Sequence, residues 1–177
     1  REKIMSTERA LYRDAEFVLR QEVREPRSYS SILESIAKGN TKIGNIINDT
    51  GLDKGVVAKY HGVLIDLHLV QREVPITEKS PGKSRKGIYR LSDHFFRFWF
   101  RFVYPNMQAI EDGRQDWVMD QVVRPRLDEF VGPIFEQVAR EVLQTMDRAG
   151  QLAFRLIKIG RWWDKDAEID LIGIGEK

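Results

Sequence analysis

Two carboxylates in the last third of the chain occupy positions where apolar side chains would normally pack. Asp170 interrupts the apolar run 168–174, and Glu136 lies within an apolar helical pattern. In an extended strand Asp170 shares a face with Ile172 and Ile174, so we expect buried neighbours on both sides of it. An ionised carboxylate in such a place is costly unless it is paired or binds a cation. A helix Glu and a strand Asp can bind a divalent metal ion, which would activate water and neutralise a scissile phosphate.

The same two residues also permit an ordinary structural interpretation. In that interpretation Glu136 points to solvent, while Asp170 pairs with Arg161 or Lys158 across a β-hairpin. Judged on the residue types alone, the structural interpretation is the favoured one.

A second group of chemically active residues is cationic. Lys83, Arg85 and Lys86 lie in a Pro-Gly turn between two stretches with strand character, Val70–Thr77 and Gly87–Leu91. Phosphate contacts require positive charge and reach more than fixed geometry, so a flexible cationic turn suits a nucleic-acid partner.

Three short helices are predicted before this hairpin. Ser28 can cap the first and Gly39 ends it, Gly51 ends the second, and Asp53 caps the third. The apolar stripe expected to be buried in the third helix consists of Val56, Tyr60, Val63, Leu64 and Leu67. Three helices followed by a basic hairpin are the order of a winged helix-turn-helix domain.

A winged helix of this composition is expected to bind duplex DNA. Its third helix would enter the major groove with Lys54, Lys59 and His61, while the cations of the wing would contact phosphates. The alternative is a protein-docking winged helix whose lysines only keep a loop solvated. The local excess of positive charge favours DNA.

Composition limits the remaining choices. The chain has 177 residues, 42% of them hydrophobic, and a net charge of only +2. The charges are nevertheless segregated, because residues 53–91 hold eight basic and four acidic side chains, whereas residues 111–147 hold four basic and nine acidic. With no cysteine, disulfides, thiolate metal sites and cysteine catalysis are excluded. No stretch predicts a signal peptide or membrane span, so we expect a cytoplasmic protein without a membrane partner.

The other predicted elements surround these two groups. Residues 1–27 are read as one amphipathic helix and a connector, and the aromatic segment 95–104 as a helix that ends at Pro105 and holds two domains together. Further helices, divided at Pro125 and Pro133, precede a hairpin. The strands of that hairpin are predicted at 154–163 and 168–174.

Four stretches carry a resemblance to a known family. They are SYSSILESIAKGNTKIGNIINDTGLDKGVVAKYHGVLIDLHLVQREVPITEK, GIYRLSDHFFRFWFRFVYPN, GPIFEQVAREVL and IGRWWDKDAEIDLIGI. Together they span residues 28–174 and resemble the C-terminal region of archaeal-type AAA ATPases, in which a winged helix precedes a nuclease-like domain of uncharacterised role. The resemblance implies a restriction-endonuclease-like fold of the PD-(D/E)XK class, with Glu136 as the helix carboxylate and Asp170 as the strand aspartate at a Mg²⁺ site.

The sequence departs from that pattern in two ways. The family's Glu-x-Lys strand is missing, because the chain reads GIGEK after the second strand and Glu176 and Lys177 are adjacent. We therefore expect this chain to be inactive as a nuclease, with Mg²⁺ bound only in a complete nuclease-like domain. The chain also lacks the phosphate-binding loop of an ATPase, so ATP is expected only for an upstream domain and no cofactor for this fragment.

These inferences together define an α+β protein in which a winged helix-turn-helix domain precedes a truncated restriction-endonuclease-like α/β domain. The expected segments are a connecting helix at 1–27, the winged helix at 28–94, the aromatic helix and loop at 95–117, and the partial nuclease-like domain at 118–177. Expected partners are duplex DNA, the upstream ATPase domain of the same protein and a second copy paired through the open sheet edge at 168–174. A protein-interaction or regulatory module that docks on its own ATPase domain or another partner is the alternative.

Overall fold

The computed structural model describes residues 5, 10–23 and 25–176, and it is a mixed α+β structure. Helices account for most of it, and each of its two sheets has two strands. By compactness the chain divides into two units. We call Arg1–Arg72 with Tyr89–Leu127 the helical unit, and Glu73–Ile88 with Asp128–Lys177 the hairpin unit.

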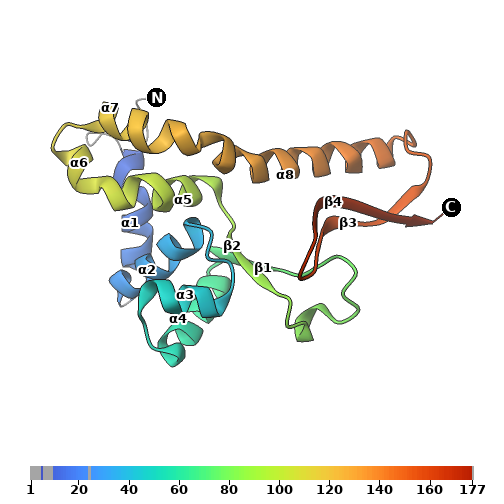
Figure 1. Cartoon of the computed structure of the whole chain (residues 1–177), viewed down its shortest axis with the longest axis horizontal. Helices are drawn as coiled ribbons and strands as arrows, with labels where there is room; N and C mark the ends of the chain where they lie inside the picture. The colour runs from blue at the N-terminus through green and yellow to red at the C-terminus, as the bar shows by residue number, and fades with distance from the viewer. Residues whose placement is uncertain (1–4, 6–9, 24, 177) are drawn as a thin grey trace. The chain divides into compact units, whose positions relative to one another are not determined.

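Within the described residues, the first helices of the helical unit are α1 (Ala10–Glu22), α2 (Pro26–Ala37), α3 (Ile43–Thr50) and α4 (Lys54–Asp66) (Figure 1). α2 begins before the predicted Ser28, because Pro26 already has the backbone angle of a first helical residue. The ends predicted at Gly51 and Asp53 are confirmed, whereas the second helix, expected from Asn40 or Thr41, begins at Ile43. Gly51 adopts a left-handed conformation (φ 66°) after α3, and the Asp53 carboxylate accepts a 2.7 Å hydrogen bond from the Gly55 amide at the start of α4.

The buried face of α4 differs in part from the predicted one. Val57, Tyr60, His61 and Leu64 are buried, a spacing that follows one face of a helix. The prediction placed Val56, Val63 and Leu67 there instead, and these three side chains are only partly buried. Adjacent valines at 56 and 57 made the phase of the stripe ambiguous, since one residue rotates the helix by about 100°.

Two short strands follow α4, namely β1 (Val70–Glu73) and β2 (Ile88–Leu91). They pair with each other as predicted. β1 is shorter than the predicted Val70–Thr77 stretch, since the Ile76 amide donates instead to the carbonyl of Arg161. The loop that joins them contains a 3-10 turn at Pro81–Lys83. The predicted order of three helices and a hairpin is therefore present as α2, α3, α4, β1 and β2.

The aromatic segment is helical but continues past its proline. α5 (His94–Phe98) passes through a π-helical turn at Trp99–Val103 and a 3-10 turn at Tyr104–Asn106 into α6 (Met107–Glu111). The prediction that Pro105 ends this helix was wrong. Proline removes one N–H and crowds the carbonyl four residues earlier, and a wider turn just before it relieves that conflict.

The same succession of turns recurs twenty residues later. α7 (Gln115–Val118) leads through a π-helical turn at Met119–Val123 and a 3-10 turn at Arg124–Arg126 into α8 (Leu127–Arg148). Pro133 lies inside α8, so the prediction that prolines separate helices here was also wrong.

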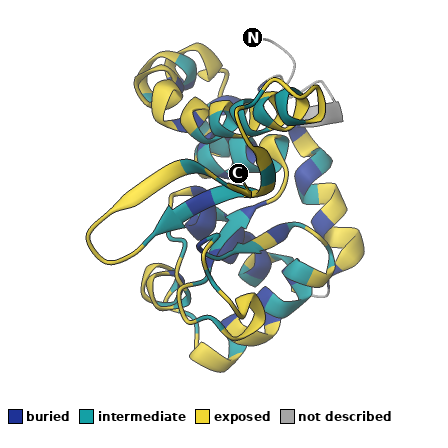
Figure 2. Ribbon diagram, turned by 90° about the vertical axis from the view of Figure 1, so that its right-hand side faces the viewer, coloured by how far each residue is buried: buried dark blue, intermediate teal, exposed yellow. Residues whose placement is uncertain are grey.

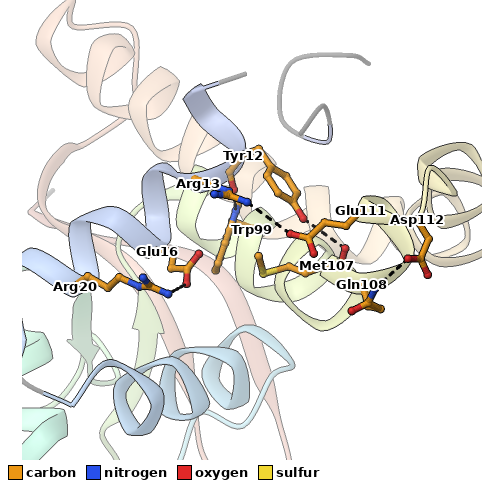
Figure 3. A network of polar contacts seen from close by, with 9 residues as sticks. All are labelled: Tyr12, Arg13, Glu16, Arg20, Trp99, Met107, Gln108, Glu111 and Asp112. Carbon is orange, nitrogen blue, oxygen red and sulfur yellow. Dashed lines mark hydrogen bonds and ion pairs between the residues drawn. The ribbon is translucent and has the colours of Figure 1, made fainter. Parts of the chain in front are cut away.

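The aromatic segment packs inside the helical unit. Trp99, Phe100, Phe102 and Val103 are fully buried, and the Trp99 indole donates a 2.8 Å hydrogen bond to the carbonyl of Tyr12. Phe102 and Val103 follow Trp99 by three and four positions, which is the spacing of one side of a helix. Figure 3 shows the surrounding polar contacts between α1 and α6, which include the Tyr12 hydroxyl donating to the Met107 carbonyl at 3.4 Å. Burial and the nearby carboxylate of Glu111 raise the pKa of Tyr12 to about 12.

The hairpin unit contains α8 and the antiparallel strands β3 (Arg155–Trp163) and β4 (Glu168–Glu176). This hairpin confirms the prediction. Its turn is closed by Asp164, whose carboxylate accepts hydrogen bonds from the amides of Asp166 and Ala167. Those two donors lower the pKa of Asp164.

Burial is distributed unequally between the units. Nearly all buried apolar side chains of the described residues belong to the helical unit, whereas in the hairpin unit Pro75, Ile88 and Phe130 join them (Figure 2). Within the described part of the chain, no helix has the length and apolar character needed to cross a membrane.

Candidate nucleic-acid interface and carboxylate cluster

Two of the three residues predicted to read DNA from α4 lie on its surface. Lys54 and Lys59 are exposed, and the Lys59 ammonium lies 5.8 Å from the ring centroid of Tyr60. The Tyr60 hydroxyl donates a 2.5 Å hydrogen bond to Glu25, the residue before α2. The exposed side of α4 therefore offers two cations beside an anchored aromatic ring.

His61 requires a correction. It is 5% exposed and its ring contacts that of Tyr89 edge-on, with centroids 4.0 Å apart. A side chain buried in this way does not reach a base edge, so the predicted DNA contact by His61 does not fit the structure. Burial lowers the pKa of His61, and its Nε2 atom has no hydrogen-bond partner among the described residues. The helix phase explains the error, since His61 follows Tyr60 on the packed side.

The predicted wing cations are exposed. Lys83, Arg85 and Lys86 all lie on the surface of the loop between β1 and β2, and so does Lys79, which was not among the predicted contacts. Lys86 forms a 3.1 Å ion pair with Glu78, and this contact lowers the pKa of Glu78. The charge of Lys86 is thus partly compensated, which leaves Lys83 and Arg85 as the stronger candidates for phosphate contacts.

Both limbs of this loop contact strand β3. On the outgoing limb the Ile76 amide donates to the carbonyl of Arg161 at 2.9 Å. On the returning limb the Trp163 indole donates to the carbonyl of Lys86 at 3.2 Å. The Ile76 side chain lies over Gly160, where an added Cβ would meet its Cδ1 at 3.5 Å.

The two predicted metal ligands are brought together around an arginine. Arg161 is 8% exposed, and its guanidinium contacts Glu136 at 3.3 Å and Asp170 at 3.0 Å. It also contacts Glu168 closely. We call Arg161 and these three acidic residues the carboxylate cluster. The pairing of Asp170 with Arg161 confirms the structural alternative for that residue, but Glu136 pairs with the same arginine instead of pointing to solvent.

Asp170 itself is not buried. Its side chain is 63% exposed, contrary to the expectation from strand alternation. The pairing of β3 with β4 is irregular here, because Gly160 pairs with Ile172 while Trp162 pairs with Ile169. Asp170 and Leu171 of β4 thus lie opposite a single residue of β3, Arg161. Such a bulge breaks the alternation of side chains between the two faces of the strand.

The residues of this cluster do not fit a metal ion as they stand. The guanidinium of Arg161 already lies between the carboxylates and supplies the positive charge that a metal would bring. No group of three or more His, Cys, Asp or Glu side chains in the described ranges has an arrangement suited to metal binding. Mg²⁺ binding therefore stays a prediction for a longer chain.

The C-terminal part of the chain is similar to one known family. Residues 99–177 match a family described as archaea bacterial proteins of unknown function, DUF234. The chain is also 37% identical to the Methanocaldococcus jannaschii protein MJECL04 over 163 residues, which are 92% of this chain and 36% of that protein. The chain thus spans little more than a third of the length of the curated relative it matches. No solved structure matches.

Three residues with a structural role at these sites were not identified from the sequence. They are Ile76, Glu168 and, as an anchor of the wing, Trp163. Trp163 was expected only to pack within its hairpin. A usable signal was the pair of adjacent tryptophans, because one of two neighbours in a strand must face away from the side on which the other packs.

Proposed function

We propose that this chain is the nucleic-acid-binding region of a longer archaeal-type ATPase. In this proposal a winged helix formed by α2, α3, α4 and the β1–β2 loop binds duplex DNA. The observation that supports it most directly is the exposure of the four cations in that loop. Positive side chains that reach beyond the packed backbone suit contacts to phosphates, which need charge and not a fixed base register.

Salt-dependent binding tests the proposal. Lys83, Arg85 and Lys86 changed together to Ala should weaken binding of a labelled duplex, measured by fluorescence anisotropy. The slope of log Kd against log salt should fall by about one per lost phosphate contact. Because Glu78 already pairs with the charge of Lys86, we expect the triple change to remove about two phosphate contacts and not three.

A matched variant controls for net charge. Arg148, Arg155 and Lys158 are exposed cations of the hairpin unit outside the loop, and their joint change to Ala removes the same charge. This control should bind duplex DNA nearly as well as the unchanged chain. If the unchanged chain shows no binding at about 50 mM salt, where phosphate contacts are strong, the DNA proposal is wrong.

A protein-interaction module is the second candidate, and one observation favours it. Val131, Phe135, Val138 and Val142 form an exposed apolar stripe on α8. Single exposed apolar residues are ordinary, but an aligned set suggests a surface that another protein covers. In this candidate the chain docks on its own ATPase domain or on a partner protein.

The ATPase and nuclease activities belong to the longer protein in this proposal. Phosphate release by the full-length protein, with and without duplex DNA, tests the first, and absence of hydrolysis under both conditions contradicts it. Metal-dependent nicking of plasmid DNA tests the second. An Asp170→Ala change that leaves the nicking rate unaltered would show that the carboxylate cluster is not involved.

A further inference from the structure

We infer that strand β3 positions the wing, so that the C-terminal hairpin controls how the loop between β1 and β2 presents its cations. This inference rests on the proposed function and concerns the regulation of the same binding surface. By compactness the loop belongs with β3 and β4, whereas α4 belongs to the helical unit. The two parts of the proposed DNA surface therefore depend on different parts of the chain.

The attachment involves both limbs of the loop and two neighbouring positions of one strand. Arg161 accepts from the Ile76 amide through its carbonyl, and Trp163 donates its indole N–H to the Lys86 carbonyl. The Arg161 contact is made by the backbone of β3 and the Trp163 contact by a side chain, so β3 holds the two limbs through two different groups that are two residues apart. A loop tied at both ends loses much of the conformational freedom that a Pro-Gly turn would otherwise retain.

Contacts within the loop, between its two attachments to β3, support the same arrangement. Lys86 pairs with Glu78, and the Lys86 amide donates to the Ser84 hydroxyl at 3.1 Å. The ion pair connects the returning limb to the outgoing one, and the hydrogen bond to Ser84 stabilises the turn of the returning limb itself. The exposed Lys83 and Arg85 lie between them and project from a framed loop.

Arg161 of β3, whose carbonyl accepts from Ile76, occupies a special position in the hairpin. Arg161 lies at the irregularity between β3 and β4, where it has no single residue opposite it. Its carbonyl pairs with the wing, while its guanidinium pairs with the carboxylate cluster. One residue thus links the position of the wing to the packing of α8 against the hairpin.

The experiment compares Trp163→Phe with Trp162→Phe. Trp163→Phe keeps an aromatic ring but removes the donor to Lys86, and Trp162→Phe makes the same chemical change at the neighbouring residue. The first readout needs no DNA: limited trypsin digestion, followed by mass spectrometry, at the exposed Lys83 and Arg85. We expect cleavage there to accelerate about five-fold in Trp163→Phe, as loss of one hydrogen bond predicts, and to stay unchanged in Trp162→Phe.

The second readout is affinity for a labelled duplex at about 50 mM salt. Trp163→Phe should weaken binding two- to five-fold without a change in formal charge, whereas Trp162→Phe should bind as the unchanged chain does. Equal trypsin cleavage in the two variants would overturn the inference. Faster cleavage in Trp163→Phe with unaltered DNA affinity would also overturn it, because the wing would then act independently of its attachment.

The two proposals can fail separately. If the unchanged chain binds no duplex while Trp163→Phe still opens the loop to trypsin, the DNA function is wrong and the attachment of the wing to β3 stands. A thermal unfolding curve for each variant tests for general loss of structure. In addition, trypsin cleavage should rise only within residues 79–86 and not across the helical unit.

Discussion

Arg161 combines three carboxylate contacts and a backbone contact in one buried residue. Its guanidinium pairs with Glu136 from α8 and with Glu168 and Asp170 from β4. Only an arginine offers several donors in a fixed plane, so a lysine cannot reproduce this set of contacts. Two of the carboxylates are well exposed, and solvent weakens their contribution.

Replacement of Arg161 by Met should destabilise the hairpin unit by about 1–3 kcal/mol. The change leaves Glu136 partly buried without its cation, which costs more than loss of a surface ion pair. Hydrogen exchange of the amides in β3 and β4 measures the effect. Arg155→Met is the matched control in the same strand, because Arg155 is exposed. Equal exchange in the two variants would show that the cluster adds nothing to stability.

His61 makes stability depend on pH. Its folded pKa lies below the ordinary value of 6.5 because burial disfavours the charged form. The unfolded chain therefore binds more protons between the folded pKa and 6.5, so stability is fully present above pH 6.5 and declines as pH falls below it. Urea unfolding at pH 7.5 and 5.5 should show this loss, and His61→Phe should reduce it.

His94→Gln is the matched control for this experiment, since His94 is exposed at the start of α5. Comparison with this variant separates loss of the buried ring at position 61 from loss of a histidine in general. A His61→Phe variant with the same dependence as the unchanged chain would assign the effect to other groups.

At the scale of elements, α8 presents two different faces. On one side Glu136 is bound to Arg161 and Asp147 accepts from the Leu156 amide, and the partly buried Ala139 and Leu143 lie on the same side. The opposite side carries the exposed apolar stripe, in which Phe135 is 70% exposed.

Phe135→Glu should leave the free energy of unfolding within about 0.5 kcal/mol of the unchanged chain, because the ring is exposed. It should also lower self-association at high concentration, measured by light scattering. Phe130→Ala provides the contrast five residues earlier in α8. Phe130 is buried, and its loss should cost about 3 kcal/mol. A loss above 1 kcal/mol in Phe135→Glu would show that the stripe packs within the chain.

Prediction from the sequence succeeded best for the ends of helices α3 and α4. Gly51 and Asp53 mark helix ends through contacts with their nearest neighbours, so their types alone indicated the boundaries. The prolines misled, because a π-helical turn before Pro105 and another before Pro125 kept the chain helical. Such a turn depends on the packing of the flanking side chains, which a residue type does not specify.

At the scale of the whole molecule, the two units differ in their sources of stability. The helical unit has an apolar core that includes Leu33, Leu64 and Trp99, whereas the hairpin unit is held largely by hydrogen bonds and ion pairs. Burial of apolar area contributes about 25 cal/mol per Å², far more in total than a few polar contacts at a surface.

Native-state hydrogen exchange should therefore separate the units. Amides in α2 and α4 should exchange slowly, through global unfolding, while those in β3 and β4 should exchange at least ten-fold faster through local opening, a difference of roughly 1.4 kcal/mol. Uniform protection across both sets would contradict this division. The result also bears on the DNA proposal, because a readily opened hairpin would release the wing.

The sequence by itself determined the order of helices and hairpins and the exposure of the basic loop. These features follow from repeat spacing, capping residues and turn composition, which act between residues a few positions apart. Only the tertiary structure decided that His61 is buried, that Asp170 is exposed and that Arg161 lies between the carboxylates. Each of these depends on contacts between segments distant in the sequence, and the bulge that turns Asp170 outward arises from strand register, which residue spacing along one strand does not specify.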